Sequence, residues 1–367
     1  MIPVSKPYIL NQDINSVSKV MRAGWITSEG PEVKLFEKKF SQYIKKKYAS
    51  TVSNGTAALE IAVKSLDLKK GDEVIIPNFT IVSNLIAVIK NGLKPVVVDC
   101  DPITWNMNIP QIESAINSKT KAIIATHIYG YPLAIDKIRK IFKKKKLFLI
   151  EDAAEMLGHK YKNKKCGYYG DISIFSFYAN KHVTTGEGGI ILTNSKKLDK
   201  KIKSLRNLCF GKKDRFNHDD IGWNYRLSNL QAAFGLSQFS RIDKTLSMKK
   251  KIGKLYFEKL KNNENIFIQK PKYQNFENVY WVVGILIKKK SITAKVLIDN
   301  LKKKGIQTRP FFFPMKRQKF LKKYNIKIAG TFPVSDHISK YGLYLPSGPN
   351  ISIKNIYKVC DEINKFI

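Results

Sequence analysis

Cysteine is scarce in this sequence, and no two cysteines lie close together. The four of them are spread over 367 residues without a CxxC pair: Cys100, Cys166, Cys209 and Cys360. We therefore expect neither a disulfide framework nor a metal site of the zinc-finger type, and the cysteines fit free thiols in a reducing compartment.

Long apolar runs are also missing. The longest, such as residues 281–287 (WVVGILI), are far shorter than a bilayer crossing requires. The opening residues, MIPVSKPYIL, lack the basic and then apolar segments of a signal peptide. These two absences predict a cytoplasmic protein without a membrane partner.

Acidic residues are few: the sequence has 29 of them and 66 lysines and arginines, which gives a formal net charge of +37. Lysine clusters recur along the whole length, at 45–47, 143–146, 288–290 and 302–304. No RNA-binding sheet motif, zinc finger or separate basic tail accompanies them, so no specific nucleic-acid partner is expected. A protein that binds polyanions through its charge remains an alternative.

Short apolar runs alternate with helical patterns from about residue 50 onward. The runs lie at 72–77, 94–101, 121–130, 146–152, 172–177 and 188–194, and most are continuous Val, Ile and Leu without polar alternation. Such runs are typical of strands covered on both faces, and residues 56–66 have the spacing of an amphipathic helix. The pattern predicts an α/β fold with a mainly parallel sheet.

The pattern changes beyond residue 242, where lysine-rich helical stretches surround one apolar run. We therefore predict a large α/β domain over residues 1–242 and a smaller α+β domain over 243–367. About the first 20 residues are expected to pack on the small domain.

Three features fall where predicted strands end, the edge at which open α/β sheets hold their ligands. Residues 53–59 (SNGTAAL) begin a helix whose first amides and Thr56 hydroxyl suit a phosphate, although an ordinary helix cap is the alternative. Asp152 follows an apolar run, where it either caps a helix or holds a proton on a heterocyclic nitrogen. Lys181 lies between aromatic residues and the turn TTGEGG.

These three features together match the needs of one cofactor. Pyridoxal phosphate requires a lysine for its aldehyde, an acid for its ring nitrogen and an anion site for its phosphate. A lysine that is shielded from water favours the neutral amine that this chemistry uses. The order of phosphate turn, aspartate and lysine therefore predicts a pyridoxal phosphate site.

The chain resembles the DegT/DnrJ/EryC1/StrS family of sugar aminotransferases, which are fold type I pyridoxal phosphate enzymes. The resemblance runs from IPVSKP to LYLPSGP, through motifs that occur in family order: SNGTAALEIA, GDEVIIP, IEDAAE, FSFYANK, TTGEGG, GWNYRLSNLQAA and TRPFFFPM. It implies a large domain with a seven-stranded, mainly parallel sheet and a smaller α+β C-terminal domain. It also implies a homodimer with shared active sites.

Specific roles follow from the resemblance. Lys181 matches the lysine that binds the cofactor and carries protons, Asp152 matches the partner of the ring nitrogen, and Glu155 matches a polar contact to its phenolic oxygen. The phosphate cradle is implied to comprise Gly55, Thr56, Ser176 and, from the neighbouring subunit, Asn224.

Two positions near the motifs need separate comment. Ile81 stands where many members have an aromatic residue that stacks on the cofactor. His182 follows Lys181, and some relatives with histidine in place of the lysine are dehydratases; the lysine here favours transamination. For His127, at a strand end, a buried structural role is preferred to acid–base work.

The substrate side is less defined. The resemblance implies substrate contacts at Arg309 and along 25–29, with Trp25, Thr27 and Ser28 as candidates. The alternatives are a structural role for Arg309 on a turn and a core role for Trp25. Phe313 stands where a histidine is expected in relatives that make GDP-perosamine.

The implied reaction moves an amino group from glutamate, which leaves as 2-oxoglutarate, to a nucleotide-linked 4-keto-6-deoxy sugar. GDP-4-keto-6-deoxymannose, giving GDP-perosamine, is the first choice of acceptor. A dTDP- or UDP-4-keto-6-deoxyglucose, giving a viosamine-type product, is the second. A non-catalytic regulator is the remaining alternative, besides a polyanion-binding protein.

Overall fold

A seven-stranded sheet forms the centre of the computed structural model, which describes residues 1–211 and 213–367. The strand order is β1-β9-β8-β5-β4-β2-β3. The strands are β1 (Tyr48–Val52), β2 (Glu73–Pro77), β3 (Lys94–Val98), β4 (Thr120–Thr126), β5 (Phe148–Asp152), β8 (Ile172–Ser176) and β9 (Gly189–Thr193). β9 runs antiparallel to β1 and β8, whereas the other pairs are parallel. The predicted mainly parallel sheet is thus confirmed.

Six of these strands coincide with the apolar runs in the sequence, but β1 was missed. Its residues, YASTV, are small or carry hydroxyl groups, so they do not form an aliphatic run. Even so, four of its five residues are buried. The strand lies at the edge of the sheet, where it pairs with β9 from Tyr48–Thr193 to Val52–Gly189.

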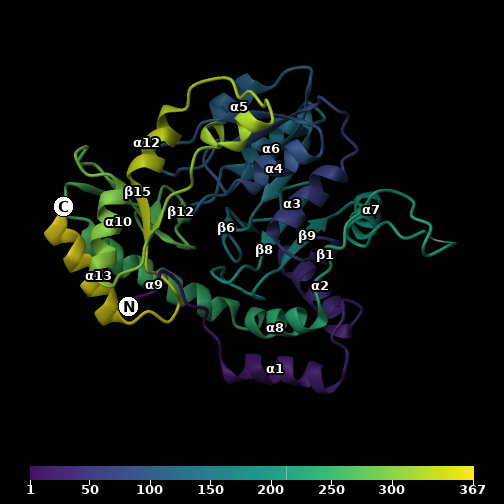
Figure 1. Ribbon diagram of the computed structural model, residues 1–367, viewed down its shortest axis with the longest axis horizontal. Coiled ribbons are helices and arrows are strands. Elements are labelled where there is room, and N and C mark those ends of the chain that lie inside the picture. The colour runs from purple at the N-terminus through teal and green to yellow at the C-terminus, as the bar shows by residue number, and fades with distance from the viewer. Residues whose placement is uncertain (212) are drawn as a thin grey trace.

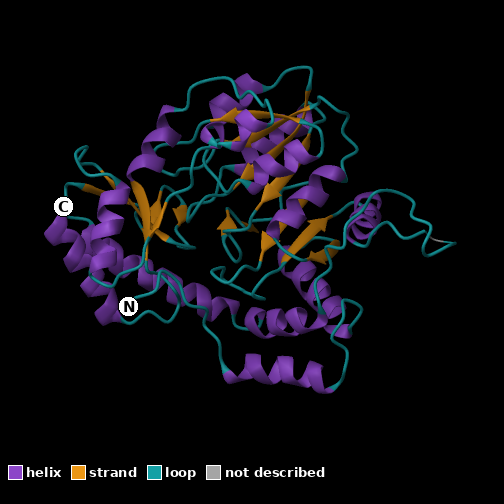
Figure 2. Ribbon diagram, in the orientation of Figure 1, coloured by secondary structure: helices purple, strands orange, loops and turns teal. Residues whose placement is uncertain are grey.

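Helices cover both faces of this sheet (Figure 2). They are α2 (Pro31–Ile44), α3 (Gly55–Lys64), α4 (Ser83–Lys90), α5 (Ile109–Ala115), α6 (Ile135–Lys144), α7 (Lys196–Arg206) and α8 (Asn229–Phe239). On one face, Phe40 of α2 packs edge-on against Phe175 of β8. On the other face, apolar residues of α3 and α4 join Ile174 of β8 in a separate buried cluster. Burying both faces explains the uninterrupted aliphatic strands.

A second, four-stranded sheet follows in the order β10-β13-β15-β14. Its strands are β10 (Ile266–Ile268), β13 (Val283–Ile287), β14 (Arg309–Pro310) and β15 (Gly342–Leu345). The helices of this part are α9 (Ile242–Leu260), α10 (Ala294–Lys303), α11 (Phe320–Lys323), α12 (Pro333–Tyr341) and α13 (Ile353–Phe366), with a 3₁₀ turn at Met315–Arg317. Two small hairpins complete the fold: β6 (Lys160–Tyr161) with β7 (Lys164–Lys165), and β11 (Lys272–Tyr273) with β12 (Phe276–Glu277).

The N-terminal residues contact both parts. Ile2 forms a parallel bridge with Ile306, and the carbonyl of Val4 accepts a hydrogen bond from the amide of Ser347. Helix α1 (Asn11–Arg22) then packs along α8 beneath the seven-stranded sheet (Figure 1). The division into two domains at residue 242 stays a prediction.

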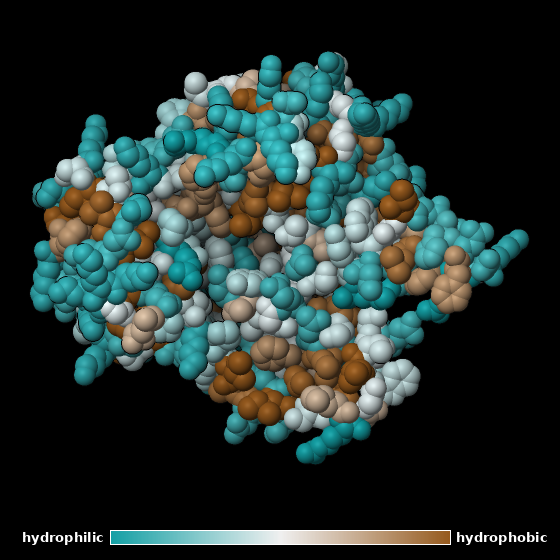
Figure 3. All heavy atoms as spheres, viewed as in Figure 1, coloured by the Kyte–Doolittle hydropathy of each residue, from teal (hydrophilic) through white to brown (hydrophobic). Residues whose placement is uncertain are grey.

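The molecular surface is largely hydrophilic on the face shown in Figure 3, which is hollowed near its middle. Over the described residues, none of the helices has both the length and the apolar character needed to cross a bilayer.

Asp13 holds α1 against α8 through a buried ion pair. Its carboxylate accepts hydrogen bonds from Arg241 Nη1 at 2.7 Å and from Ser237 Oγ at 2.6 Å, and it is 1% exposed. Burial raises the pKa of Asp13, but these hydrogen bonds outweigh it and leave the pKa below its usual value. The folded state therefore favours the ionised carboxylate.

Replacing Asp13 by alanine should lower the free energy of unfolding by about 3–5 kcal/mol at neutral pH, because Arg241 keeps a buried charge without its partner. Since the folded-state pKa is lowered, this difference should shrink as the pH falls below about 4. Denaturant unfolding measures it, with Glu258→Ala, which breaks the exposed pair to Lys261, as a control that costs under about 1 kcal/mol. Equal losses in both variants would contradict the role of Asp13.

Candidate active site

A cavity of about 640 Å³ lies at the carboxyl edge of the seven-stranded sheet. Its lining residues include the ends of three neighbouring parallel strands: Thr126 of β4, Asp152 of β5 and Ser176 of β8. The start of α3, which follows β1, adds Gly55 and Thr56. The three features singled out in the sequence therefore meet in one cavity, because parallel strands bring their ends to a common edge.

Lys181 is held in the turn after β8, where its amide donates to the carbonyl of Tyr178. Its Nζ lies 3.6 Å from the ring centroid of Trp281 and 4.0 Å from Glu155 Oε1, and its side chain is 11% exposed. Burial lowers the pKa of this amine, although the charges of Glu155 and Asp152 oppose the shift. The site thus favours the neutral, nucleophilic amine more than water does.

The two carboxyl groups of the cavity respond to burial in the opposite direction. Burial raises the pKa of Glu155 to about 8, despite the charge of Lys181 and a hydrogen bond of 2.8 Å from the amide of Tyr129. Burial also raises the pKa of Asp152, against a 3.1 Å hydrogen bond from the amide of Ala154 and the charge of Lys181. A cation placed beside Asp152, such as a protonated ring nitrogen, would restore its ionised form.

Behind Asp152, His127 has a structural role. Its Nδ1 accepts the amide hydrogen of Leu133 at 2.9 Å, so the ring hydrogen sits on Nε2 and points to Glu151 Oε1 at 3.1 Å. The ring is fully buried and does not line the cavity. The structural role preferred from the sequence for His127 agrees with this geometry.

The start of α3 forms a cradle for an anion. Asn54 caps the helix by accepting from the amide of Ala57 at 2.8 Å, and the first amides of a helix have no partner within it. The hydroxyls of Thr56 and Ser83 lie 2.7 Å apart and both line the cavity. Hydroxyls and free amides at a helix start are the donors that a phosphate prefers.

Glycines make room for this cradle. A Cβ on Gly55 would lie 3.0 Å from the Cβ of Ser176, and one on Gly189 would lie 2.7 Å from the carbonyl oxygen of Asn54. A side chain on Gly189 would clash with the helix start, and one on Gly55 would crowd Ser176, so these glycines allow the helix start to approach the end of β8 and the start of β9 closely.

Unpaired polar atoms show that the cavity suits a polar guest. Thr80 Oγ1 and Asn180 Oδ1 are buried without a hydrogen-bond partner among the described residues, and both residues line the cavity. Together with one amine, two carboxyl groups and the cradle, they fit pyridoxal phosphate. Lys181 would hold its aldehyde, Asp152 its ring nitrogen, and Gly55, Thr56 and Ser176 its phosphate.

Five of the expected site residues do not line this cavity. Asn224 is exposed, although its neighbour Tyr225 does line it. Trp25 is 59% exposed, and the carbonyls of Trp25 and Thr27 accept hydrogen bonds from Asn229. Ser28 lines a separate cavity of about 200 Å³. Arg309 is exposed on β14, where it pairs with the cavity residue Tyr344.

The sequence did not reveal the aromatic wall of the cavity. Trp281, Phe312 and Tyr344 line it from the C-terminal part of the chain. Trp281 precedes β13 in an apolar run that reads as core, and its Nε1 donates to the carbonyl of Asn180 at 3.0 Å. No local pattern indicated that it would reach Lys181. Ile81 also lines the cavity and is 44% exposed.

Comparison with known proteins agrees with this geometry. The family model of the DegT/DnrJ/EryC1/StrS aminotransferases matches residues 7–364. The chain belongs to this family. The predicted family, the fold type I architecture, the cofactor pyridoxal phosphate and the enzyme class of sugar aminotransferase are thereby confirmed.

Two curated relatives carry the same name, GDP-perosamine synthase. The protein of Escherichia coli O157:H7 is 37% identical over 100% of this chain and 98% of its own length, and that of Vibrio cholerae is 34% identical over 100% and 99%. Among solved structures, Helicobacter pylori PseC, an aminotransferase involved in the biosynthesis of pseudoaminic acid, superposes with a TM-score of 0.93. It is 25% identical over 99% of this chain and 98% of its own.

Replacing Glu155 by glutamine should change how stability depends on pH. Between about pH 5 and pH 8 the folded protein keeps a proton on Glu155 that the unfolded chain has released, so the wild type loses stability as the pH rises through this range. The variant lacks this loss, which amounts to at most about 1.4 kcal/mol per pH unit. Denaturant unfolding of cofactor-free protein at several pH values measures the difference.

The matched control for this experiment is Glu264→Gln, at an exposed position. Its stability should stay parallel to that of the wild type across the same pH range. If the curve of Glu155→Gln is also parallel, then Glu155 does not titrate near pH 8 in the folded protein.

Proposed function

We propose that this enzyme transfers the amino group of glutamate to C4 of GDP-4-keto-6-deoxymannose and so forms GDP-perosamine. The donor leaves as 2-oxoglutarate. The observation that carries the choice of acceptor is the match of the whole chain to two relatives named GDP-perosamine synthase, at 37% and 34% identity.

The cavity supplies the groups that such a transfer needs. When bound, pyridoxal phosphate provides an electron-withdrawing ring that stabilises negative charge at the neighbouring carbon. Burial lowers the pKa of Lys181, so this amine is suited to take a proton from the carbon of the donor. It would give a proton back to carbon when the sugar accepts the amino group. Asp152 would keep a proton on the ring nitrogen, and Glu155, 4.0 Å from the Lys181 amine, keeps its own proton up to about pH 8.

Water is kept away from these proton transfers by the aromatic wall. The ring of Trp281 covers the amine of Lys181, and Phe312 and Tyr344 continue the wall toward β14. We assign Arg309, which pairs with Tyr344 along the strands, to the diphosphate of the sugar nucleotide. An exposed arginine beside the cavity mouth is suited to this because it can bind phosphate oxygens in pairs.

A dTDP- or UDP-4-keto-6-deoxyglucose is the second candidate acceptor. Phe313, at the position where a histidine is expected for the first choice, is 51% exposed and does not line the cavity, whereas its neighbour Phe312 does. The histidine expected for the GDP-linked sugar is therefore absent, and the choice of that sugar depends on the match to the two relatives.

The acceptor can be identified from the absorbance of the bound cofactor. Purified protein with pyridoxal phosphate should show a band near the visible edge that is lost on adding glutamate. The band should return with GDP-4-keto-6-deoxymannose and at least about tenfold more slowly with the dTDP- and UDP-linked sugars. Recovery only with a dTDP- or UDP-linked sugar would overturn the choice of acceptor.

Lys181→Ala provides the test of the lysine in the same assay. It should lose the band and lower turnover by at least about 10²-fold, because it removes the proton carrier. The exposed Lys254→Ala, on α9, should behave as the wild type. Normal turnover in Lys181→Ala would contradict the assignment.

We further propose a homodimer in which Asn224 of each subunit completes the phosphate site of the other. Asn224 is exposed next to Tyr225, which lines the cavity, and the segment 213–222 extends from the body of the protein (Figure 1). Trp25, Thr27 and Ser28 are assigned to the substrate side of the same shared site. We place the enzyme in the cytoplasm, since its four cysteines are free and buried.

Shared sites predict complementation between two inactive variants. Lys181→Ala and Asn224→Ala should each be nearly inactive alone. After mixing and subunit exchange, a hybrid dimer contains one intact site, so the mixture should recover about a quarter of wild-type activity. No recovery, with exchange verified by differently tagged subunits, would mean that Asn224 serves its own subunit or none.

A further inference from the structure

A second large cavity, of about 870 Å³, lies at the opposite edge of the same sheet. Its lining includes the residues before β1, at the start of β5 and before β8, which are Lys46, Phe148 and Asp171. These are the amino ends of strands whose carboxyl ends form the active site. The two cavities therefore share no lining residue and can be occupied independently.

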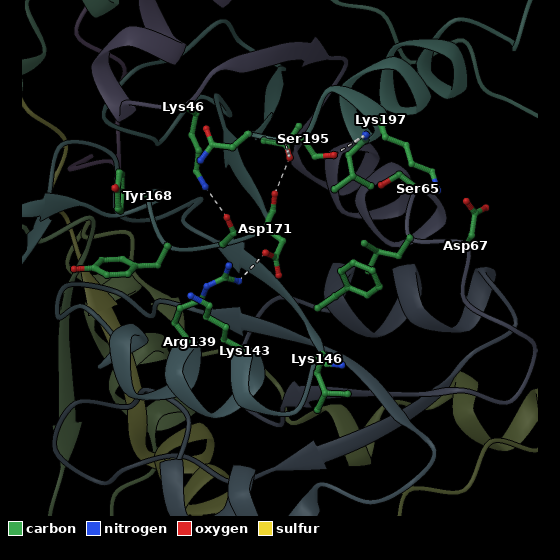
Figure 4. A pocket seen from close by; sticks show the side chains of 18 residues that line it. Lys46, Ser65, Asp67, Arg139, Lys143, Lys146, Tyr168, Asp171, Ser195 and Lys197 are labelled. Atoms are coloured by element: carbon green, nitrogen blue, oxygen red, sulfur yellow. Dashed lines mark hydrogen bonds and ion pairs between the residues drawn. The ribbon is translucent and has the colours of Figure 1, made fainter.

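Cations from several elements surround this cavity. Arg139 and Lys143 lie on α6, and Lys146 follows that helix. Lys46 precedes β1, and Lys197 lies at the start of α7. Arg139 and Lys143 are four residues apart, so they share one face of the helix. Figure 4 shows these side chains arranged around the cavity on different sides.

The acidic residues of the lining neutralise only part of this charge. Asp171 accepts from Arg139 Nη1 at 2.7 Å and from the amide of Leu149 at 2.9 Å. Asp67 pairs with Lys201, which lies outside the lining. No ion pair is found for Lys143, Lys146 or Lys197 within the described part of the chain.

Lys46 sets this cavity apart from an ordinary lysine-rich surface. It is 6% exposed, and its ammonium donates to the carbonyl of Gly170 at 2.5 Å. Lys46 and Arg139 approach the turn of Gly170 and Asp171 from opposite sides (Figure 4). Burial lowers the pKa of Lys46 to about 8, while the charges of Glu151 and Asp171 oppose this. An anion in the cavity would relieve the cost of keeping this ammonium away from water.

We propose that this cavity binds the diphosphate group of a small molecule. Lys46 and Arg139 form an inner pair of donors, and Lys143, Lys146 and Lys197 form an exposed outer set. Two groups of cations match two linked phosphates better than a single one, because each phosphate then has its own charged donors. Tyr168 and Phe148 add aromatic surface on which a base can stack.

Calorimetric titration of the enzyme loaded with pyridoxal phosphate tests this proposal. The loaded form is used because its own phosphate site is filled. Inorganic pyrophosphate and GDP are the two probes, at about 0.15 M salt, where weak surface attraction is screened. The triple variant Lys143→Ala, Lys146→Ala and Lys197→Ala should bind pyrophosphate at least about tenfold more weakly than the wild type.

The matched control removes the same charge elsewhere. Lys302, Lys303 and Lys304 are exposed at the end of α10 and outside the cavity, and their triple alanine variant should bind pyrophosphate as the wild type does. Equal weakening in both variants would show attraction by net charge alone and overturn the proposal. The proposal would also be overturned if the cavity variant bound both pyrophosphate and GDP as tightly as the wild type does.

The GDP titration distinguishes the two sources of the diphosphate. If the cavity variant has a lower affinity for GDP than the wild type, and GDP binds the cavity more tightly than pyrophosphate does, then the ligand is a nucleotide. If pyrophosphate binds as tightly as GDP, the diphosphate alone is recognised. Both results support the site. GDP can also bind at the proposed acceptor site. The cavity substitutions do not change that binding, so only the part of the GDP binding that they weaken is attributed to the cavity.

Discussion

The exclusion of water from the amine of Lys181 is the constraint on which the active site depends. An amine, two carboxyl groups and an aromatic ring meet at the ends of β5 and β8, where burial disfavours the charged form of each titratable group. The groups therefore set one another's protonation. The scaffold must hold them within a few ångströms, and a rigid parallel sheet with buried faces can do this.

Strand β5 separates two tasks because neighbouring residues of a strand point to opposite faces. Asp152 lines the active site, whereas Glu151 accepts the amides of Gly167, Tyr169 and Gly170 on the other side. The same turn offers the Gly170 carbonyl to Lys46. Two adjacent buried carboxylates of one strand thus face different surroundings: Glu151 fixes a turn, and Asp152 faces the cavity.

Much of the fold could be predicted because local pattern determines it. Aliphatic runs gave six strands of the central sheet, and the order of cradle, Asp152 and Lys181 gave the cofactor. Strand β1 was missed because its stability comes from pairing with β9, which leaves no aliphatic signal. Trp281 was missed because it reaches Lys181 through long-range packing, which spacing along the chain does not indicate. Asn224 and the residues near Trp25 lie outside the cavity of the single chain, so the roles expected for them stay predictions.

The pairing of the N-terminus has a consequence for how the chain matures during synthesis. Ile2 and Val4 are made about 300 residues before their partners, Ile306 and Ser347. The seven-stranded sheet can assemble while the N-terminal segment is still unpaired. Closure of the second sheet must wait until β15 has been made, and a product that stops before Ile306 would keep residues 2–4 unpaired.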